Sequence, residues 1–116
     1  MDAGRARTLL QAEREEVLGL LRGAENEVRQ DREAEVDSEA GDTGDAALPL
    51  TEEATSEDVA GTLRDRLDAI ERALRRVEDG TYGRSVRSGK PIPDERLEAD
   101  PVAELTVDEA RADQAR

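Results

Sequence analysis

The sequence predicts a mainly α-helical protein in which a long antiparallel helical hairpin carries a small C-terminal module. Three observations predict this fold. Apolar residues recur at steps of three and four over two long stretches, turn residues gather between those stretches, and Tyr82 is the only aromatic residue available to a layered core. A composition with 41% charged and 35% hydrophobic residues also suits a disordered chain. The helical periodicity decides between the two classes.

The first predicted helix covers residues 5–38. No proline interrupts it, and Gly19 and Gly23 each cost roughly 1 kcal/mol relative to alanine. Polar Glu, Arg and Gln residues separate the apolar positions, as expected for a helix with one buried face. That apolar seam consists of Leu10, Val17, Leu20, Leu21, Ala24 and Val28.

The second predicted helix begins at Thr51 or Ser56 and ends at Asp79. Its apolar residues are spaced close to a heptad repeat, which is typical of helices that pair along a seam. Gly80 follows as the predicted C-cap. The seam consists of Val59, Leu63, Leu67, Ile70, Leu74 and Val77.

We expect the two helices to fold back on each other as a hairpin domain over residues 1–79, with its tip at 41–50. The stretch "GDTGDAALP" supplies turn residues, and a register that places Val28 opposite Leu63 centres the hairpin there. The arm would be about 50 Å long at the α-helical rise. The same seam could instead build a homodimeric coiled coil or a small bundle, but the central turn favours a monomer.

Residues 80–109 form the predicted module, and residues 110–116 a C-terminal tail. The stretch "GTYGRSVRSGKPIPDERLEADP" has the rhythm of a metal-binding knuckle, yet Ser85 and Ser88 stand where a knuckle carries cysteines. Thirty residues rarely build a sufficient core, so part of the module must pack against the base of the hairpin. The available apolar anchors are Tyr82, Val86, Ile92, Leu97, Val102, Leu105 and Val107.

Charge and composition exclude several function classes. A net charge of −13 repels phosphate backbones, so direct DNA binding is not expected. No apolar run reaches membrane length and the N-terminus has no apolar signal region, which predicts a soluble cytoplasmic protein. The chain has neither histidine nor cysteine, and no nucleophile–base pair or phosphate-binding loop is present. We therefore expect no enzymatic activity and no cofactor.

The second half of the chain closely resembles the DksA/TraR family of transcription regulators. In that family a helix ending in a phrase like "ALxRIxxGTYGxC" runs into "CGxxIxxxRLxAxPxAxxC". A D-x-x-D-x-A motif at the tip of the family's coiled coil is matched by "DTGDAA", which supplies Asp42, Asp45 and Ala47 at the hairpin's midpoint. The other matches are Ala73, Leu74, Val77, Gly80, Thr81, Tyr82, Gly83, Gly89, Ile92, Arg96, Leu97, Ala99, Pro101, Ala103 and Leu105.

The resemblance implies a zinc-finger-like module that lacks zinc. The family's four zinc-binding cysteines would fall at Ser85, Ser88, Thr106 and Glu109. Structural zinc needs thiolate or imidazole ligands, and hydroxyls with one carboxylate do not provide them. We expect no metal, and a module that holds its shape by packing and hydroxyl hydrogen bonds or is mobile.

The resemblance also implies the partner and the site. DksA-like proteins insert the hairpin into the secondary channel of RNA polymerase, where tip aspartates act near the catalytic centre. Asp45 and then Asp42 are the expected acting residues, and Ala47 permits close approach. Two aspartates in a turn can also be simple turn formers. Because adjacent acidic residues are absent from the motif, transcript cleavage is not the expected activity.

Basic residues near the module are candidates for docking to the polymerase, although a solvated face with local ion pairs explains them equally well. The positions that bind ppGpp in responsive relatives align with Ala69, Asp100 and Ala110, and none is basic, which makes a ppGpp response doubtful. The candidate docking residues are Arg72, Arg75, Arg76, Arg84, Arg87, Lys90 and Arg96.

The predicted function is therefore modulation of transcription initiation through RNA polymerase. The alternative is a degenerate paralogue that acts as a non-polymerase interaction module or as a self-associating coiled coil.

Overall fold

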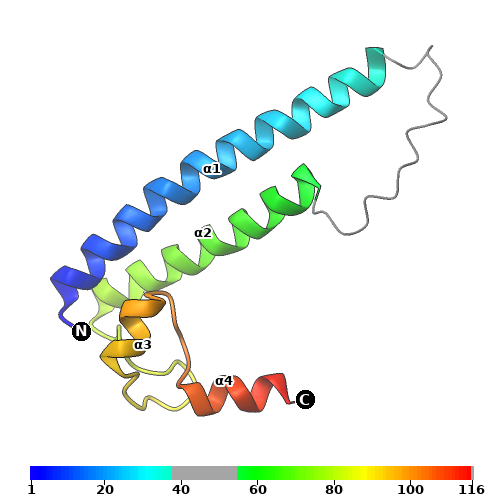
Figure 1. Cartoon of the computed structure of the whole chain (residues 1–116). Coiled ribbons are helices and arrows are strands. Elements are labelled where there is room, and N and C mark those ends of the chain that lie inside the picture. The colour runs from blue at the N-terminus through cyan, green and yellow to red at the C-terminus, as the bar shows by residue number, and fades with distance from the viewer. Residues whose placement is uncertain (38–54, 116) are drawn as a thin grey trace. The chain divides into compact units, whose positions relative to one another are not determined.

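The structure is a computed structural model that describes residues 1–37 and 55–115, with side chains described for 1–34 and 55–115. Its helices are α1 (Ala3–Asp37), α2 (Ser56–Asp79), α3 (Asp94–Ala99) and α4 (Val107–Gln114) (Figure 1). The described residues contain an isolated bridge between Arg84 and Pro91 and no longer strand. The prediction of a mainly helical fold is confirmed. Within the same residues, no helix combines the length and apolarity needed to span a membrane.

The described chain divides into two compact units, which we treat separately. The base unit comprises Met1–Glu15 and Leu67–Arg116, and the arm unit comprises Glu16–Arg66. Both long helices contribute to each unit. The predicted domain boundaries after residues 79 and 109 stay a prediction.

Both long helices begin at a side chain that caps them. The Asp2 carboxylate accepts hydrogen bonds from the backbone N–H groups of Gly4 and Arg5, at 3.2 and 3.3 Å. The Thr55 hydroxyl accepts from Asp58 N–H at 3.0 Å, while the Asp58 carboxylate accepts from Thr55 N–H at 3.3 Å. This reciprocal pair is a capping box with aspartate in the third position. Four backbone donors that a helix start leaves unpaired are thereby satisfied.

Helix α2 ends at Asp79 and is capped by Gly80, as predicted. Gly80 has a φ of 80°, in the left-handed region where a side chain is disfavoured. Its N–H donates to the carbonyl of Val77 at 3.3 Å, and the N–H of Thr81 donates to the carbonyl of Arg76 at 2.9 Å. These two bonds form a Schellman motif, which satisfies the last carbonyls of the helix and redirects the chain.

In the arm unit the two helices run antiparallel, which confirms the hairpin there. Arg32 pairs with Glu57 at 2.9 Å and Arg64 with Glu25 at 3.0 Å. In each pair, the two residues are offset by two positions from the pairing that the predicted register gives. An arginine side chain is long enough to span that offset. The buried residues are Val17, Leu21, Ala24 and Ala60. Leu20 is 55% exposed, so of the two adjacent leucines only Leu21 belongs to the seam.

The base unit is built around a small apolar cluster in the module. Ile92, Leu97 and Ala103 are buried together, and Met1 and Tyr82 pack against them. The Tyr82 hydroxyl donates to the carbonyl of Pro101 at 2.8 Å, so the ring lies in the apolar cluster while its polar end is satisfied. Leu10 and Ile70 are also fully buried in this unit.

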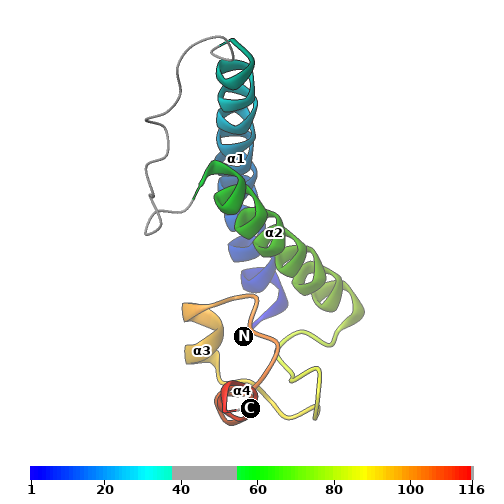
Figure 2. The same ribbon diagram turned by 90° about the vertical axis from the view of Figure 1, so that its right-hand side faces the viewer.

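A short irregular segment, residues 83–92, which we call the knuckle, connects α2 to α3. Figures 1 and 2 both show it beside α3 and α4. Ser85 N–H donates to the carbonyl of Lys90 at 2.8 Å, and Ile92 N–H donates to that of Gly83 at 2.8 Å. Two of the seven residues that were available as anchors do not serve as such, because Val86 is 57% exposed and Val107 is 38% exposed.

Val86 lies in a turn of the knuckle and faces solvent. Its neighbour Ser85 is only 4% exposed. The Val86 N–H donates to the carbonyl of Glu104 at 2.9 Å. Its backbone is therefore held while its side chain is not buried.

Candidate functional site

The predicted tip residues Asp42, Asp45 and Ala47 lie outside the described residues, and their role stays a prediction. The other predicted site residues belong to the base unit, in the module and the adjoining part of α2. They fall into two groups: the four positions aligned with zinc ligands, and the seven basic residues.

The four positions aligned with zinc ligands converge on one carboxylate. The Ser85 hydroxyl donates to Oε1 of Glu109 at 2.6 Å, and the backbone N–H of Thr106 donates to the same oxygen at 2.9 Å. The Ser85 oxygen in turn accepts from the N–H groups of Arg87 and Ser88, at 3.1 and 3.2 Å. Hydroxyl hydrogen bonds thus join the knuckle to the start of α4.

Glu109 also belongs to the cap of α4. Thr106 is the N-cap residue, and its hydroxyl accepts from Glu109 N–H at 3.3 Å, which completes a capping box. Hydrogen bonds from the hydroxyls of Ser85 and Ser88, and from the backbone of Thr106, lower the pKa of Glu109 to about 2. The carboxylate is therefore ionised near neutral pH, when its hydrogen bonds are strongest.

This donor set does not fit zinc. Three hydroxyl side chains and one carboxylate replace the thiolates and imidazoles that bind zinc in structural sites. Both Ser85 and Glu109 already use their oxygens in hydrogen bonds to protein groups. Elsewhere in residues 1–37 and 55–115, His, Cys, Asp and Glu form no group of three that could hold a metal ion.

Four of the seven candidate docking residues hold the base unit together. Arg72 and Arg76 donate to the same oxygen of Glu104, at 2.9 and 3.2 Å. The Arg87 guanidinium pairs with Asp113 of α4 at 2.9 Å. Arg96 Nε donates to the carbonyl of Leu105 at 2.9 Å.

The Glu104 carboxylate is the most enclosed acid of this network. Burial raises its pKa, but hydrogen bonds and charge from Arg72 and Arg76 outweigh burial, so that the net shift of the pKa is downward. The same contact with Glu104 raises the pKa of Arg72. Both partners are thus stabilised in their charged forms, as in a structural ion pair.

The remaining three, Arg75, Arg84 and Lys90, are exposed and form no ion pair within the described part of the chain. The Arg84 guanidinium donates only to the neutral carbonyl of Gly89, at 3.4 Å. Sequence alone could not separate these residues from the other four, because the partners of those four lie up to 32 residues away along the chain.

The positions aligned with ppGpp contacts face one pocket of about 280 Å³ in the base unit. Ala69 from α2, Asp100, and Ala110 from α4 line it together with Arg72, Arg96, Val102, Ala103, Glu104 and Leu105. Its two arginines are balanced by two acids, and Arg72 is held by Glu104. A pocket with no net positive charge is a poor site for a polyphosphate.

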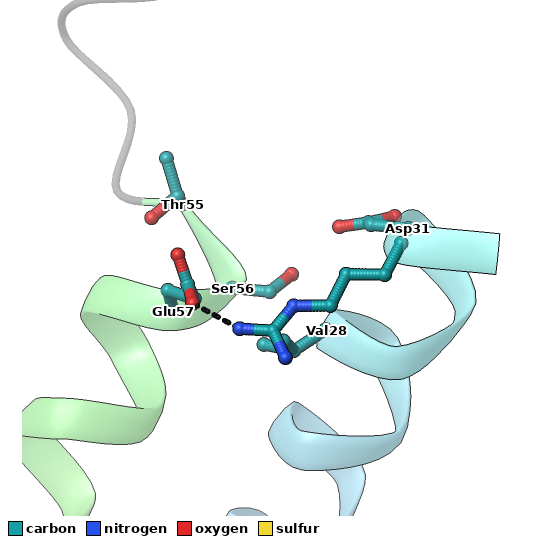
Figure 3. A pocket seen from close by; sticks show the side chains of 6 residues that line it. Val28, Asp31, Thr55, Ser56 and Glu57 are labelled. Atoms are coloured by element: carbon teal, nitrogen blue, oxygen red, sulfur yellow. Dashed lines mark hydrogen bonds and ion pairs between the residues drawn. The ribbon is translucent and has the colours of Figure 1, made fainter. Parts of the chain in front are cut away.

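The arm unit has two grooves that are lined by charges of both signs. One, of about 240 Å³, is lined by Val28, Asp31, Arg32, Thr55, Ser56 and Glu57 (Figure 3). A second, of about 440 Å³, is lined by Glu25, Val28, Arg29, Arg32, Glu57 and Arg64. Arg32 and Arg64 pair with carboxylates across these grooves, and Arg29 donates to Asn26 at 2.8 Å. The first groove has one acid more than arginines and the second one arginine more than acids, so neither concentrates charge of one sign.

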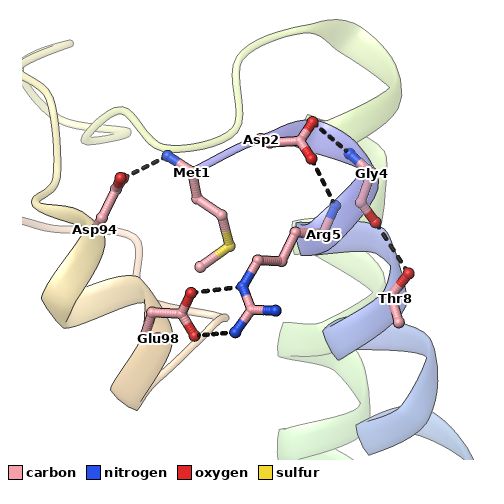
Figure 4. Close-up of polar contacts among 7 residues, drawn as sticks. All are labelled: Met1, Asp2, Gly4, Arg5, Thr8, Asp94 and Glu98. Carbon is pink, nitrogen blue, oxygen red and sulfur yellow. Dashed lines mark hydrogen bonds and ion pairs between the residues drawn. The ribbon is translucent and has the colours of Figure 1, made fainter.

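The start of α1 is tied to α3 by contacts that sequence reasoning missed. Arg5 donates to both carboxylate oxygens of Glu98, at 2.6 and 2.8 Å, and the amino group of Met1 pairs with Asp94 (Figure 4). The hydrogen bond from Arg5 lowers the pKa of Glu98. Because the partners are 93 residues apart, no local pattern reveals them.

Comparison with known proteins supports the resemblance. No family model matches the chain. General stress protein 16O of Bacillus subtilis is 45% identical over 64 residues, which is 55% of this chain and 39% of that protein. The RNA polymerase-binding transcription factor DksA of Caulobacter vibrioides is 40% identical over 67 residues, or 58% of this chain and 47% of that protein. The chain thus spans less than half the length of these curated relatives.

A solved structure extends the likeness beyond the matched sequence. The structure of transcription factor DksA2 from Pseudomonas aeruginosa is similar with a TM-score of 0.74, at 27% identity over 98% of this chain and 84% of that chain. The printed names describe transcription factors and not enzymes, which agrees with the prediction of no catalytic activity. In its helical fold and its matched sequence the chain is therefore similar to DksA-like proteins, although it contains no cysteine.

Proposed function

We propose that this protein binds RNA polymerase in the cytoplasm and modulates transcription initiation. One observation carries the proposal: the likeness to DksA2 over 98% of the chain, at a TM-score of 0.74. The printed name of the Caulobacter relative supports polymerase as the partner. The net charge of −13 supports an action through protein contacts instead of DNA contacts.

In this proposal the hairpin enters the secondary channel and delivers Asp42 and Asp45 near the catalytic centre. A carboxylate there can perturb mobile polymerase elements, the bound Mg²⁺ or the path of entering nucleotides. The antiparallel helices of the arm unit support a hairpin of the required kind. Ala47 provides the small side chain that lets the tip approach closely.

Docking is assigned to the exposed cations Arg75, Arg84 and Lys90. Each can pair with an acidic surface without first losing a partner in the protein, because none forms an ion pair among the described residues. Arg72, Arg76 and Arg96 instead hold the module's own carbonyl and carboxylate groups. Breaking those contacts to dock would cost the module its internal hydrogen bonds.

A response to ppGpp through the module is not part of the proposal. The pocket that contains Ala69, Asp100 and Ala110 has as many acids as arginines in its lining. Binding a polyphosphate there would leave acidic groups facing phosphate. We expect the protein to act in the same way with and without ppGpp.

The test is promoter-dependent transcription by the cognate polymerase with the wild type, Asp45→Asn and Asp65→Asn. Asp65 is exposed on α2, so its substitution removes the same charge away from the tip. The proposal predicts that wild type and Asp65→Asn change transcript yield, whereas Asp45→Asn binds polymerase normally and does not. A response unaltered by Asp45→Asn would remove the tip from the mechanism.

Self-association is the competing function, and exposed apolar residues of the arm unit favour it. Leu20 is 55% exposed and Val59 is 40% exposed. If these residues form a seam between copies, the sedimentation mass rises with concentration and returns to the monomer value in Leu20→Ala. A mass that stays at the monomer value at all concentrations would rule out self-association.

A further inference from the structure

We infer that the Glu109 carboxylate is the hub that holds the knuckle to α4, at the four positions that align with the zinc ligands of the family pattern. This carboxylate hub consists of Glu109 with Ser85, Ser88 and Thr106. The proposal concerns how the module keeps its shape without metal, and its main test does not involve polymerase.

The knuckle and the start of α4 meet at one oxygen atom of Glu109. Oε1 of Glu109 in α4 accepts from the Ser85 hydroxyl of the knuckle at 2.6 Å and from the Thr106 N–H at 2.9 Å. Hydrogen bonds to an ionised acceptor are shorter and about twice as strong as those between neutral groups. A carboxylate also has about four acceptor positions, so one side chain can serve several donors as a metal serves several ligands.

Ser85 links the Glu109 carboxylate to the backbone of the knuckle. Its hydroxyl oxygen accepts from the N–H groups of Arg87 and Ser88 while its proton points at Glu109. Ser85 is 4% exposed, so water cannot readily replace a lost partner. Removing the carboxylate would leave a buried hydroxyl without its acceptor, which is the costly case for a hydrogen bond.

The hub also supports the exposed surface of the knuckle that carries Arg84 and Lys90. Arg84 and Lys90 flank the hub residues on the knuckle, and Ser85 N–H donates to the Lys90 carbonyl at 2.8 Å. Glu109 is therefore a positioning residue for these two cations. Only this positioning role of Glu109 rests on the proposed polymerase docking.

The test is amide hydrogen exchange of the full-length chain, read at Arg87 and Ser88. Glu109→Ala is compared with Asp108→Ala, which removes the same charge from the exposed neighbouring position of α4. We expect exchange at both amides to accelerate about tenfold or more in Glu109→Ala and to stay at the wild-type rate in Asp108→Ala. Equal protection in all three proteins would overturn the proposal.

Glu109→Gln separates the hydrogen bonds from the charge. Its amide oxygen can still accept from Ser85 and Thr106, but without the negative charge. Exchange rates between those of the wild type and Glu109→Ala are expected. Rates equal to those of Glu109→Ala would contradict a role as hydrogen-bond acceptor, and would point to charge alone.

A second variant tests the convergence of the four positions. Combining Ser85→Cys, Ser88→Cys, Thr106→Cys and Glu109→Cys should create a site for one Zn²⁺ per chain, because tetrahedral thiolate sites need four side chains directed at one point. Zinc should restore slow exchange at residues 87 and 88 in this variant, and a chelator should leave wild-type exchange unchanged. Failure to bind zinc, or chelator-sensitive exchange in the wild type, would contradict the carboxylate hub.

Discussion

The guanidinium of Arg5, in the first turn of α1, holds both oxygens of the Glu98 carboxylate in α3 at 2.6 and 2.8 Å (Figure 4). The contact joins the start of the chain to the module across 93 residues. Paired hydrogen bonds of this type fix orientation as well as distance. The module is thus fastened to α1 as well as to α2 within the base unit.

Arg5→Ala should lower the thermal midpoint by a few degrees at most. Both side chains are about half exposed, at 56% and 43%, and exposed ion pairs contribute little to stability even when their geometry is good. Thermal unfolding followed by circular dichroism would measure it, with Arg7→Ala as the control. A large loss would show that this contact holds the module far more strongly than an exposed pair should.

Leu97→Ala should destabilise the protein by about 2–5 kcal/mol, the usual cost of truncating a buried leucine. Leu97 is fully buried against Ile92 and Ala103, so the substitution leaves a cavity. Val86→Ala is the matched control, and its effect should stay within about 0.5 kcal/mol because Val86 is exposed. Urea unfolding of the two variants gives the comparison. Similar losses would contradict the assignment of the apolar cluster.

Two glycine substitutions should have opposite signs. Gly80→Ala forces a side chain into a φ of 80° and should cost about 1–2 kcal/mol. Gly61→Ala lies inside α2, where an added methyl group meets no atom within 4 Å. It should stabilise by about 0.5–1 kcal/mol through helix propensity. The midpoints of urea unfolding measure both effects. A Gly80→Ala variant that is more stable than the wild type would rule out the capping role of Gly80.

Acid should weaken the carboxylate hub in a defined range. The pKa of Glu109 is about 2 in the folded protein against 4.5 ordinarily, so its contribution to stability is complete above about pH 4.5 and is lost as the pH falls toward 2. The groups that face it are Ser85, Ser88 and Thr106, with the Arg87 charge nearby. NMR titration of the Glu109 carboxyl would measure the pKa directly.

The control for this titration is the pH dependence of amide exchange in the knuckle. In Glu109→Gln, the amide protection of residues 87 and 88 should lose the part of its acid dependence that falls between pH 4.5 and 2. Glu98 and Glu104 also have lowered pKa values, so global unfolding would mix several carboxylates. A folded-state pKa for Glu109 close to 4.5 would contradict the hydrogen bonds assigned to it.

The helices were predictable because their signals are local. Apolar spacing predicted both long helices, and Gly80 predicted where α2 ends. The alanines Ala6, Ala60 and Ala73 are buried but were not part of the predicted seams, since a small side chain is equally common on exposed faces. Their burial depends on what lies opposite them in three dimensions.

The module shows where sequence reasoning reaches its limit. Ser85 was predicted as a position that aligns with a lost zinc ligand, but nothing in its neighbourhood indicated that it would be buried against Glu109, 24 residues away. Likewise, seven basic residues looked equivalent until the partners of four of them were located. In both cases the deciding contact joins segments that are distant in the chain.

Equilibrium binding of the labelled chain to cognate RNA polymerase tests the central claim most directly. The account predicts saturable binding by the wild type, and a Kd raised roughly three- to tenfold in Arg84→Ala/Lys90→Ala, the size expected for exposed docking charges. Arg7→Ala/Arg22→Ala removes the same charge from α1 and should bind like the wild type. If the wild-type chain shows no saturable binding to the polymerase, the account is contradicted.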